Sequence, residues 1–192
     1  MTGLVAVREL AKAPGSAVIH NLITSRAVPE IISEHGGRPV RTRVGHSYIK
    51  AEMASTDAVF GGEHSAHYYF RDFWRADTGM LAAMHVLAAL GEQPGPLAEL
   101  CAEYERYVSS GEINSTVADQ AGRVAAVRAE FAEQTTDTDT LDGLTLRLVD
   151  GAWLNVRASN TEPLLRLNVE AGSAERMAEV RDRALAVIRS EQ

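Results

Sequence analysis

Four polar side chains that could hold an anion lie close together between Arg157 and Pro163, in the segment RASNTEP. Arg157 offers a planar fork of donors and a permanent positive charge. Ser159 and Thr161 add hydroxyl donors, and Asn160 adds an amide donor. Such a set of donors around one cation suits a phosphate dianion. The alternative is a polar turn that bonds its own backbone, with the arginine in a surface ion pair.

Two further segments carry residue types that bind metals. In GGEHSAH, His64 and His67 have a spacing that can ligate zinc, and Glu63 precedes them, but no third and fourth ligands cluster nearby. The polar segment EQTTDTDTLDG contains several aspartates, yet it lacks the glycine spacing of a calcium loop, so we expect an exposed, solvated loop there. We predict no metal bound by this chain.

The elements that must position these residues change in kind near residue 108. In residues 1–107, apolar strand-like runs such as SAVIHNLIT alternate with helix-like segments such as SRAVPEIISEHGG and SYIKAEMAS. A helix capped by Asp77 or Thr78 is expected to present one apolar stripe, and another helix follows GEQPGP. This alternation predicts an α/β domain with a mixed or parallel sheet flanked by helices. The stripe consists of Met80, Leu81, Met84, Leu87 and Ala88, and the later helix is marked by Leu97, Leu100, Cys101, Tyr104 and Val108.

Residues 108–192 predict a smaller α+β domain, an antiparallel sheet with helices on one side. EINSTV reads as a strand, and a helix is expected from Asp119 to about Glu133. Alternating leucines in LTLRL lead into Asp150–Gly151, a strong hairpin signal, and the strand AWLNV follows it. RASNTEP comes next, then a second alternating run, LLRLNVEA, and a helix capped by Ser173.

Composition and charge exclude several classes of partner. The 192 residues carry a net charge of −7, and the basic residues are scattered, which argues against nucleic acid and anionic membranes. No apolar run approaches the length needed to cross a bilayer, and no signal peptide is seen. A lone cysteine, Cys101, rules out an internal disulfide and favours a small buried side chain. We expect a cytoplasmic protein.

Three motifs resemble those of the α-D-phosphohexomutases, the family of phosphomannomutase, phosphoglucomutase and phosphoglucosamine mutase. RASNTEP is similar to the phosphate-binding loop of the family's fourth domain, and GGEHSAH is similar to the sugar-binding loop of its third domain. VGHSYIK is similar to a Gly-His-Ser motif whose histidine reaches the active site. The resemblance covers nearly the whole chain, but only the family's third and fourth domains.

The resemblance implies a role for each matched residue. Glu63 and Ser65 would hold sugar hydroxyls, since a carboxylate can accept from both hydroxyls of a vicinal diol. His46 would contact the substrate or relay a proton. Two positions depart from the family pattern: Ala66 replaces a glycine and is expected to restrict positive φ, and Ile23 replaces a lysine. The residues that would grip the phosphate are Arg157, Ser159, Asn160 and Thr161.

The family's catalytic parts do not occur in this sequence. It contains neither the Ser-His-Asn-Pro loop of the phosphoryl carrier nor the Asp-Gly-Asp-Gly-Asp metal loop, so no catalytic residue is assigned. We therefore interpret the chain as the C-terminal half of a mutase that moves phosphate between C1 and C6 of a hexose, and expect it to be inactive alone. The full-length enzyme would use Mg²⁺ and a hexose 1,6-bisphosphate, and its N-terminal domains would be the natural packing partner. The alternative is a non-catalytic phosphosugar-binding or regulatory module; preference between mannose and glucose phosphates stays open.

Overall fold

The computed structural model describes residues 1–159 and 162–190, and the chain divides into two compact units, Met1–Arg106 and Tyr107–Gln192. Among the described residues, no helix has the length and apolar character needed to cross a bilayer. In the first unit the elements are α1 (Thr2–Lys12), β1 (Ala17–Asn21), α2 (Ala27–Glu34), β2 (Arg38–Thr42), α3 (His46–Thr56), β3 (Phe60–Gly62), β4 (Tyr68–Phe70), a 3₁₀ turn (Arg71–Phe73), β5 (Ala76–Asp77), α4 (Gly79–Gly91) and α5 (Leu97–Ala102). In the second they are β6 (Val108–Ser109), β7 (Ile113–Thr116), α6 (Gln120–Glu130), a 3₁₀ turn (Ala132–Gln134), β8 (Thr135–Asp139), β9 (Leu144–Leu148), β10 (Trp153–Ala158), β11 (Leu164–Ala171) and α7 (Ala174–Arg189).

The first unit is built on a mixed sheet with strand order β2-β1-β3-β4-β5. Strand β1 pairs in parallel with β2 and β3, whereas β3, β4 and β5 pair in antiparallel fashion. Every residue of β1 is buried, as expected for a central strand covered on both faces. The predicted α/β fold with a mixed sheet flanked by helices is confirmed.

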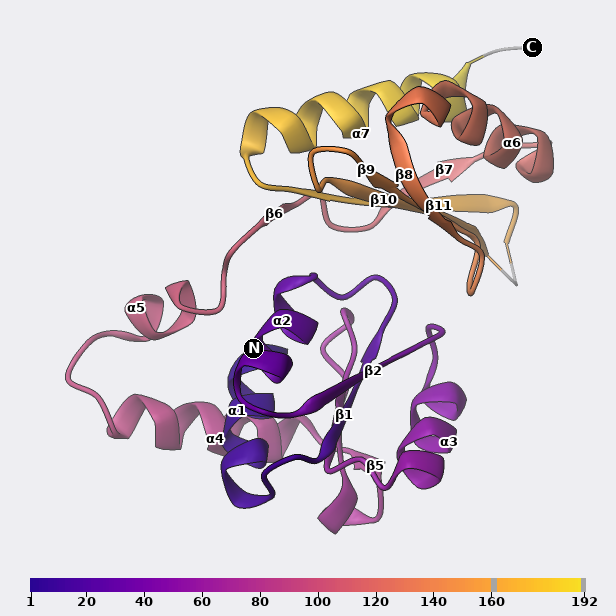
Figure 1. Cartoon of the computed structure of the whole chain (residues 1–192). Coiled ribbons are helices and arrows are strands. Elements are labelled where there is room, and N and C mark those ends of the chain that lie inside the picture. Colours follow the sequence, from indigo (N-terminus) through magenta and orange to yellow (C-terminus); the bar gives the residue numbers. More distant parts are fainter. Residues whose placement is uncertain (160–161, 191–192) are drawn as a thin grey trace. The chain divides into compact units, whose positions relative to one another are not determined.

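Helices cover both faces of this sheet (Figure 1). Val18 packs in the core formed with α1, α2 and α4, while its neighbour Ile19 packs against Ile49 and Met53 of α3. This is the period-two alternation of a strand, which sends successive side chains to opposite faces. Helix α3 therefore stands on one face, with its N-terminus after the end of β2.

Two elements of the first unit differ from the sequence prediction. Helix α1 was not predicted, although Leu4, Val5 and Ala6 are fully buried; no side chain caps its first turn, so the usual start signal is missing. The helix expected to reach Val108 is wrong in length, because α5 ends at Ala102 and Val108 lies in β6.

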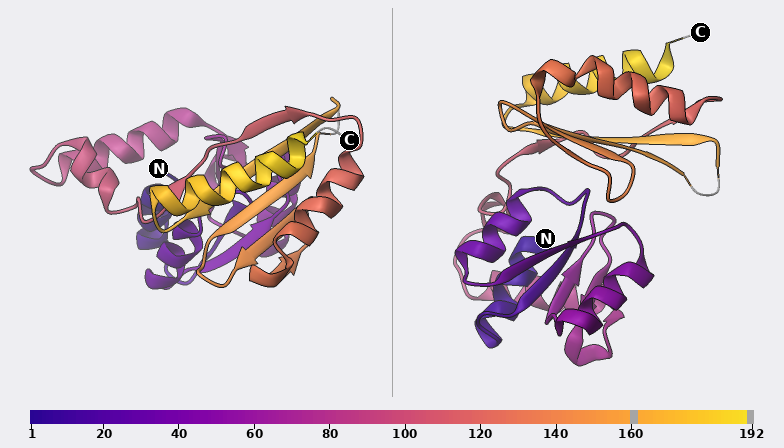
Figure 2. Two further views of the ribbon diagram at one scale, coloured as in Figure 1. Left: turned by 90° about the horizontal axis from the view of Figure 1, so that it is seen from above. Right: turned by 45° about the vertical axis from the view of Figure 1, so that its right-hand side comes forward.

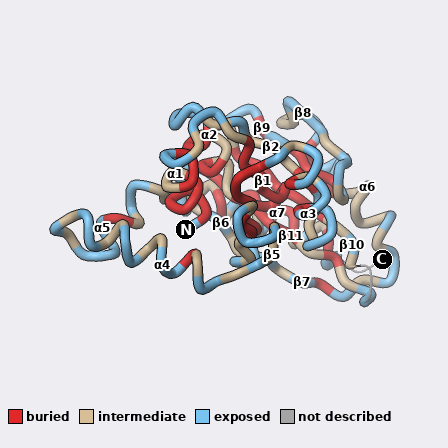
Figure 3. Tube along the Cα trace, turned by 90° about the horizontal axis from the view of Figure 1, so that it is seen from below, coloured by how far each residue is buried: buried red, intermediate tan, exposed pale blue. Residues whose placement is uncertain are grey.

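The predicted core face of α4 is wrong except at Leu81, which packs against the core. Met80, Met84 and Leu87 are 74%, 57% and 60% exposed, whereas Ala82 is buried. Helix α4 is apolar on nearly every side, so its spacing could not distinguish the buried face. The residue that marks the inward face of α4 is the polar His85, whose Nε2 lies 3.0 Å from Oε1 of Glu9 in α1. Figure 3 shows α4 as mainly exposed and intermediate positions.

The second unit is an antiparallel sheet in the order β6-β11-β10-β9-β8, with β7 also paired to β11. Helices α6 and α7 lie over the same face of this sheet (Figure 2). The fully buried leucines Leu144, Leu146 and Leu154 pack under them together with Val180 and Ala184 of α7. The predicted smaller α+β domain, with helices on one side of an antiparallel sheet, is confirmed.

The polar segment before β9 was predicted to be an exposed loop, and that prediction is wrong for Thr135–Asp139. These residues form β8, an edge strand paired to β9. An ion pair between Arg147 and Asp137 and a hydrogen bond from the Thr136 hydroxyl to the Arg147 carbonyl hold it in register. Charged residues on an edge strand also discourage pairing with another chain.

Candidate functional site

Glu63 is the buried centre of the first candidate loop. The residue comes directly after β3 and is only 3% exposed. The Tyr69 hydroxyl donates to its Oε1 at 2.6 Å. Its Oε2 accepts from the Asn21 amide and the Gly45 backbone N–H, both at 3.3 Å. These donors come from the end of β1, from β4 and from the turn before α3, so the sheet itself orients the carboxylate.

His46 joins this group through the same tyrosine. It is the first residue of α3, and its Nδ1 lies 2.6 Å from the Tyr69 hydroxyl. Because that hydroxyl gives its only proton to Glu63, it must accept the hydrogen bond from Nδ1–H of His46. Burial, together with the hydrogen bond to Glu63, raises the pKa of Tyr69, so the phenol stays protonated at neutral pH. The histidine then keeps its lone pair on Nε2.

His67 and Asp77 form a second hydrogen-bonded pair beside His46. His67 Nδ1 and Asp77 Oδ2 are 2.7 Å apart, and Asp77 Oδ1 accepts the backbone N–H of Tyr68 at 2.9 Å. Burial alone would raise the pKa of Asp77, but the bonds from Tyr68 and His67 outweigh it and lower that pKa. The carboxylate is thus ionised, and the rings of His46 and His67 meet edge to face with centroids 4.4 Å apart.

The tip of this loop is exposed at His64, Ser65 and Ala66. Backbone bonds from Glu63 N–H to the His67 carbonyl and from Ala66 N–H to the Glu63 carbonyl close it. Ala66 has φ of 63°, so the left-handed conformation expected to be restricted by its side chain is adopted nevertheless. The other departure from the family pattern, Ile23, is 4% exposed and supplies core packing in place of a cation.

The second candidate loop begins at Arg157, at the end of β10. Arg157 pairs with Glu112 at 2.9 Å and lies opposite Arg166 of β11, which binds the same carboxylate at 3.1 Å. The Ser159 N–H donates to the Leu164 carbonyl at 2.9 Å, which closes the strand pair. Asn160 and Thr161 lie outside the described residues.

Sequence reasoning missed five of these residues: Asn21, Tyr69, Asp77, Glu112 and Arg166. One signal was present for Arg166, because it alternates with the buried Leu165 and Leu167 and so had to share a face with a neighbouring strand's polar residues. The others are brought in by strand pairing, which a single segment does not reveal.

Among the described residues, one group of three side chains could hold a metal ion: His46, His67 and Asp77. It differs from the set suggested by the sequence, since His64 and Glu63 are not in it. Two imidazoles do not suit Mg²⁺, which prefers six oxygens. The aspartates of β8 are no better, because Asp137 pairs with Arg147 and Asp139 accepts the Leu141 N–H. The described residues therefore do not fit a magnesium site.

Two family models match the chain. Residues 1–107 match "Phosphoglucomutase/phosphomannomutase, alpha/beta/alpha domain III", and residues 112–187 match "Phosphoglucomutase/phosphomannomutase, C-terminal domain". A phosphomannomutase of Salmonella typhimurium is 39% identical over 186 residues, which are 96% of this chain and 41% of that protein. A phosphomannomutase of Escherichia coli is 36% identical over all 192 residues, or 42% of its own length.

A solved structure gives the same correspondence. The crystal structure of a phosphoglucomutase/phosphomannomutase family protein from Burkholderia thailandensis has a TM-score of 0.81 and 29% identity to this chain, covering 98% of it and 41% of the other chain. The chain thus spans about two fifths of the length of the relatives it matches.

Proposed function

Because the chain belongs to the phosphoglucomutase/phosphomannomutase family and comprises its domains III and IV, we propose that it binds a hexose phosphate through two loops, one in each unit. The loop around Glu63, Ser65 and His46 takes the sugar hydroxyls. The loop of Arg157, Ser159, Asn160 and Thr161 takes the phosphate.

The arrangement of hydrogen-bond donors around Glu63 supports the proposal that this loop binds the sugar. A carboxylate has about four acceptor positions, and Tyr69, Asn21 and Gly45 fill three of them. One position is left for a sugar hydroxyl, which is fewer than the two hydroxyls expected from the sequence. The group is thus held in one orientation before ligand arrives, and binding costs little side-chain entropy.

The phosphate end is supported by charge. Two guanidinium groups, Arg157 and Arg166, share the single carboxylate of Glu112, so this cluster of three carries a net charge of about +1. The Arg157 side chain is 11% exposed, a partly desolvated setting in which a charge-assisted bond to phosphate is strong.

Turnover is not part of the proposed activity of this chain alone. Moving phosphate between C1 and C6 requires a phosphoryl carrier and a metal ion, and neither the serine loop nor the Asp-Gly-Asp-Gly-Asp loop occurs in the sequence. The resemblance implies that Mg²⁺, a hexose 1,6-bisphosphate and two preceding domains complete the full-length enzyme. We propose that the protein is located in the cytoplasm.

The proposal is tested by titrating the chain with mannose 1-phosphate and following backbone amides by NMR. Saturable shifts are expected at Gly61–His67 and in the loop after Arg157. In parallel, an assay with Mg²⁺ and a hexose bisphosphate activator should show no conversion above background. Shifts confined to one loop would defeat the two-loop proposal, and measurable conversion would defeat the expected inactivity.

A further inference from the structure

An open pocket of about 320 Å³ lies in the second unit, where the end of α7 meets the turn between β7 and α6. Val117 and Ile188 give it apolar walls, and Arg123 and Arg189 bring two guanidinium groups to it. Arg157, which is proposed to hold the phosphate, does not line it. The pocket therefore needs an account of its own.

Both arginines are held in place by neutral acceptors. Arg123 donates to the Ser190 hydroxyl at 2.6 Å and to the Ser190 carbonyl at 2.5 Å, and a longer bond of 3.4 Å reaches the Val187 carbonyl. Arg189 donates through Nε to the Ser115 hydroxyl at 2.9 Å. A guanidinium has five N–H donors, so these bonds orient the two side chains and still leave donors for a ligand.

The positive charge of this arginine pair is only partly balanced. Within residues 1–159 and 162–190, neither Arg123 nor Arg189 forms an ion pair with a carboxylate. Asp119 also lines the pocket, but its Oδ1 caps α6 by accepting the Gly122 N–H at 2.8 Å. Two guanidiniums and one carboxylate leave a net charge of about +1, which favours an anion. By contrast, ion pairs with carboxylates are formed by Arg147, Arg157, Arg166, Arg176, Arg181 and Arg183.

We propose that this pocket binds a small organic monocarboxylate with an apolar body, of about the size of benzoate. The carboxylate accepts charge-assisted hydrogen bonds from Arg123 and Arg189, and the apolar body covers Val117 and Ile188. A single negative charge matches the net charge of the pocket, whereas a phosphate dianion exceeds it. A bare inorganic anion would also leave the apolar walls in contact with water.

The pocket borders the segment that anchors the proposed phosphate loop. The Val117 N–H donates to the Pro163 carbonyl at 3.2 Å, and the Gln120 side chain donates to the Leu164 carbonyl at 3.1 Å. A carboxylate ligand against Val117 would thus lie next to the end of that loop. It would use none of the residues assigned to the sugar or to the phosphate, so the two proposals are independent.

The test is an NMR titration of the whole chain with sodium benzoate near neutral pH, without sugar phosphate. Saturable shifts are expected at the backbone amides of Ala118 and Ser190. Arg123→Gln and Arg189→Gln should each weaken benzoate binding by about tenfold or more, since each removes a charged donor. Arg128→Gln is the matched control, because Arg128 is exposed on the same helix as Arg123 but does not line the pocket.

Two further ligands test the charge and the apolar body separately, on the unaltered chain. Benzamide has the shape of benzoate without its charge, and inorganic phosphate has charge without an apolar body; each should bind at these amides about tenfold or more weakly. Arg157→Ala should bind benzoate as the parent does, whatever it does to phosphate binding.

Three outcomes would overturn the proposal. The first is benzamide or inorganic phosphate binding at these amides as tightly as benzoate. The second is unchanged benzoate affinity in both Arg123→Gln and Arg189→Gln, with circular dichroism showing folded chains. The third is an equal loss in Arg128→Gln, which would mean that benzoate responds to surface charge in general.

Discussion

The phenol of Tyr69 and the carboxylate of Glu63 are joined by a 2.6 Å hydrogen bond between two buried side chains. Tyr69→Phe removes the hydroxyl and leaves Oε1 of Glu63 without that donor. A buried acceptor that loses its partner costs about 1–2 kcal/mol. We expect the free energy of unfolding, measured in urea, to fall by that amount.

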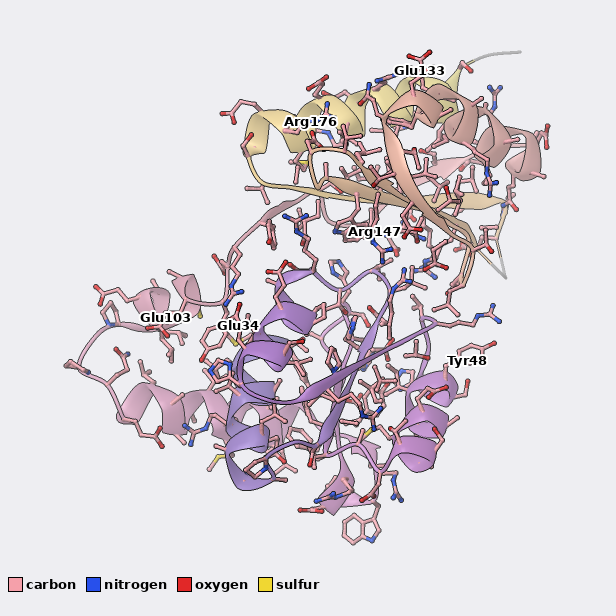
Figure 4. All side chains as sticks on the ribbon, viewed as in Figure 1. Glu34, Tyr48, Glu103, Glu133, Arg147 and Arg176 are labelled. Carbon is pink, nitrogen blue, oxygen red and sulfur yellow. The ribbon has the colours of Figure 1, made fainter. Side chains whose placement is uncertain are left out.

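Tyr48→Phe provides the matched control for Tyr69→Phe. Tyr48 lies on α3 (Figure 4) and is 42% exposed. Its ring lies under the Arg43 guanidinium. Loss of its hydroxyl should change the unfolding free energy by less than about 0.5 kcal/mol. Equal effects of the two changes would show that the Tyr69 bond to Glu63 contributes nothing specific.

Glu63→Ala should relax discrimination among hexose phosphates. The carboxylate is proposed to read a sugar hydroxyl, so its removal should bring the affinities for mannose and glucose phosphates closer together. Inorganic phosphate has no such hydroxyl, and its affinity should stay the same. Calorimetric titration with all three ligands checks this, and an equal loss for bare phosphate would contradict the role given to Glu63.

Arg157→Ala should weaken hexose phosphate binding by about 1.5–3 kcal/mol, the range for hydrogen bonds to charged groups. The remaining pair, Arg166 with Glu112, keeps the strands connected, so the fold should survive. Arg147→Ala is the control, because Arg147 lies on β9 and pairs with Asp137. A titration in which both variants bind as the parent does would exclude Arg157 from the site.

Glu112→Gln should have the opposite effect. In the structure this carboxylate neutralises part of the charge of Arg157 and Arg166, and it would repel a phosphate dianion. The neutral amide has a similar shape, so affinity for phosphate should rise, by about 0.5–1.5 kcal/mol in this partly exposed setting. Weaker binding in the same titration would mean that Glu112 orients the arginines more than it competes with the ligand.

His20 should make stability depend on pH. Burial in β1 lowers its pKa to about 4, although a bond to the Asn21 carbonyl opposes the shift. The unfolded chain therefore binds the proton first, near pH 6.5, and stability is retained above that pH and lost as the pH falls toward 4. The loss should reach at most about 3 kcal/mol over this window.

The slope of unfolding free energy against pH is the measurement for His20. His20→Gln should reduce it between about pH 5 and 6.5, where few carboxylates titrate. Some slope should remain, because burial also lowers the pKa of His85. His64→Gln changes an exposed residue and should leave the slope unaltered; a parent chain with no slope would disprove the shift.

Period-two alternation was enough to predict the second unit's sheet. Leu144, Leu146 and Leu148 are all buried, and the Asp150–Gly151 turn joins their strand to β10 as expected. The same logic failed for β8, since Thr135–Asp139 has no apolar side and is held by bonds to Arg147 and its backbone. Edge strands of this kind depend on their partner, which local sequence does not contain.

The residues of the candidate site could likewise be predicted only in part from the sequence. Glu63 stood out from its motif, but Tyr69 did not, because YYF offers two adjacent tyrosines and only the pairing of β4 with β3 decides which one turns toward Glu63. Likewise, Glu112 and Arg157 are far apart in sequence, and the β10–β11 register brings Arg166 beside them. Long-range pairing, more than residue type, sets these contacts.

Ala66 stores conformational strain at the tip of the loop that follows Glu63. An L-alanine at φ of 63° costs roughly 1–2 kcal/mol relative to ordinary backbone, and two backbone hydrogen bonds, of 2.9 and 3.2 Å, close the loop around it. Glycine at that point would remove the penalty and let the tip sample many shapes. With alanine, fewer backbone conformations are available to the tip. The loop beside His46 and Glu63 is therefore strained but restricted to few conformations.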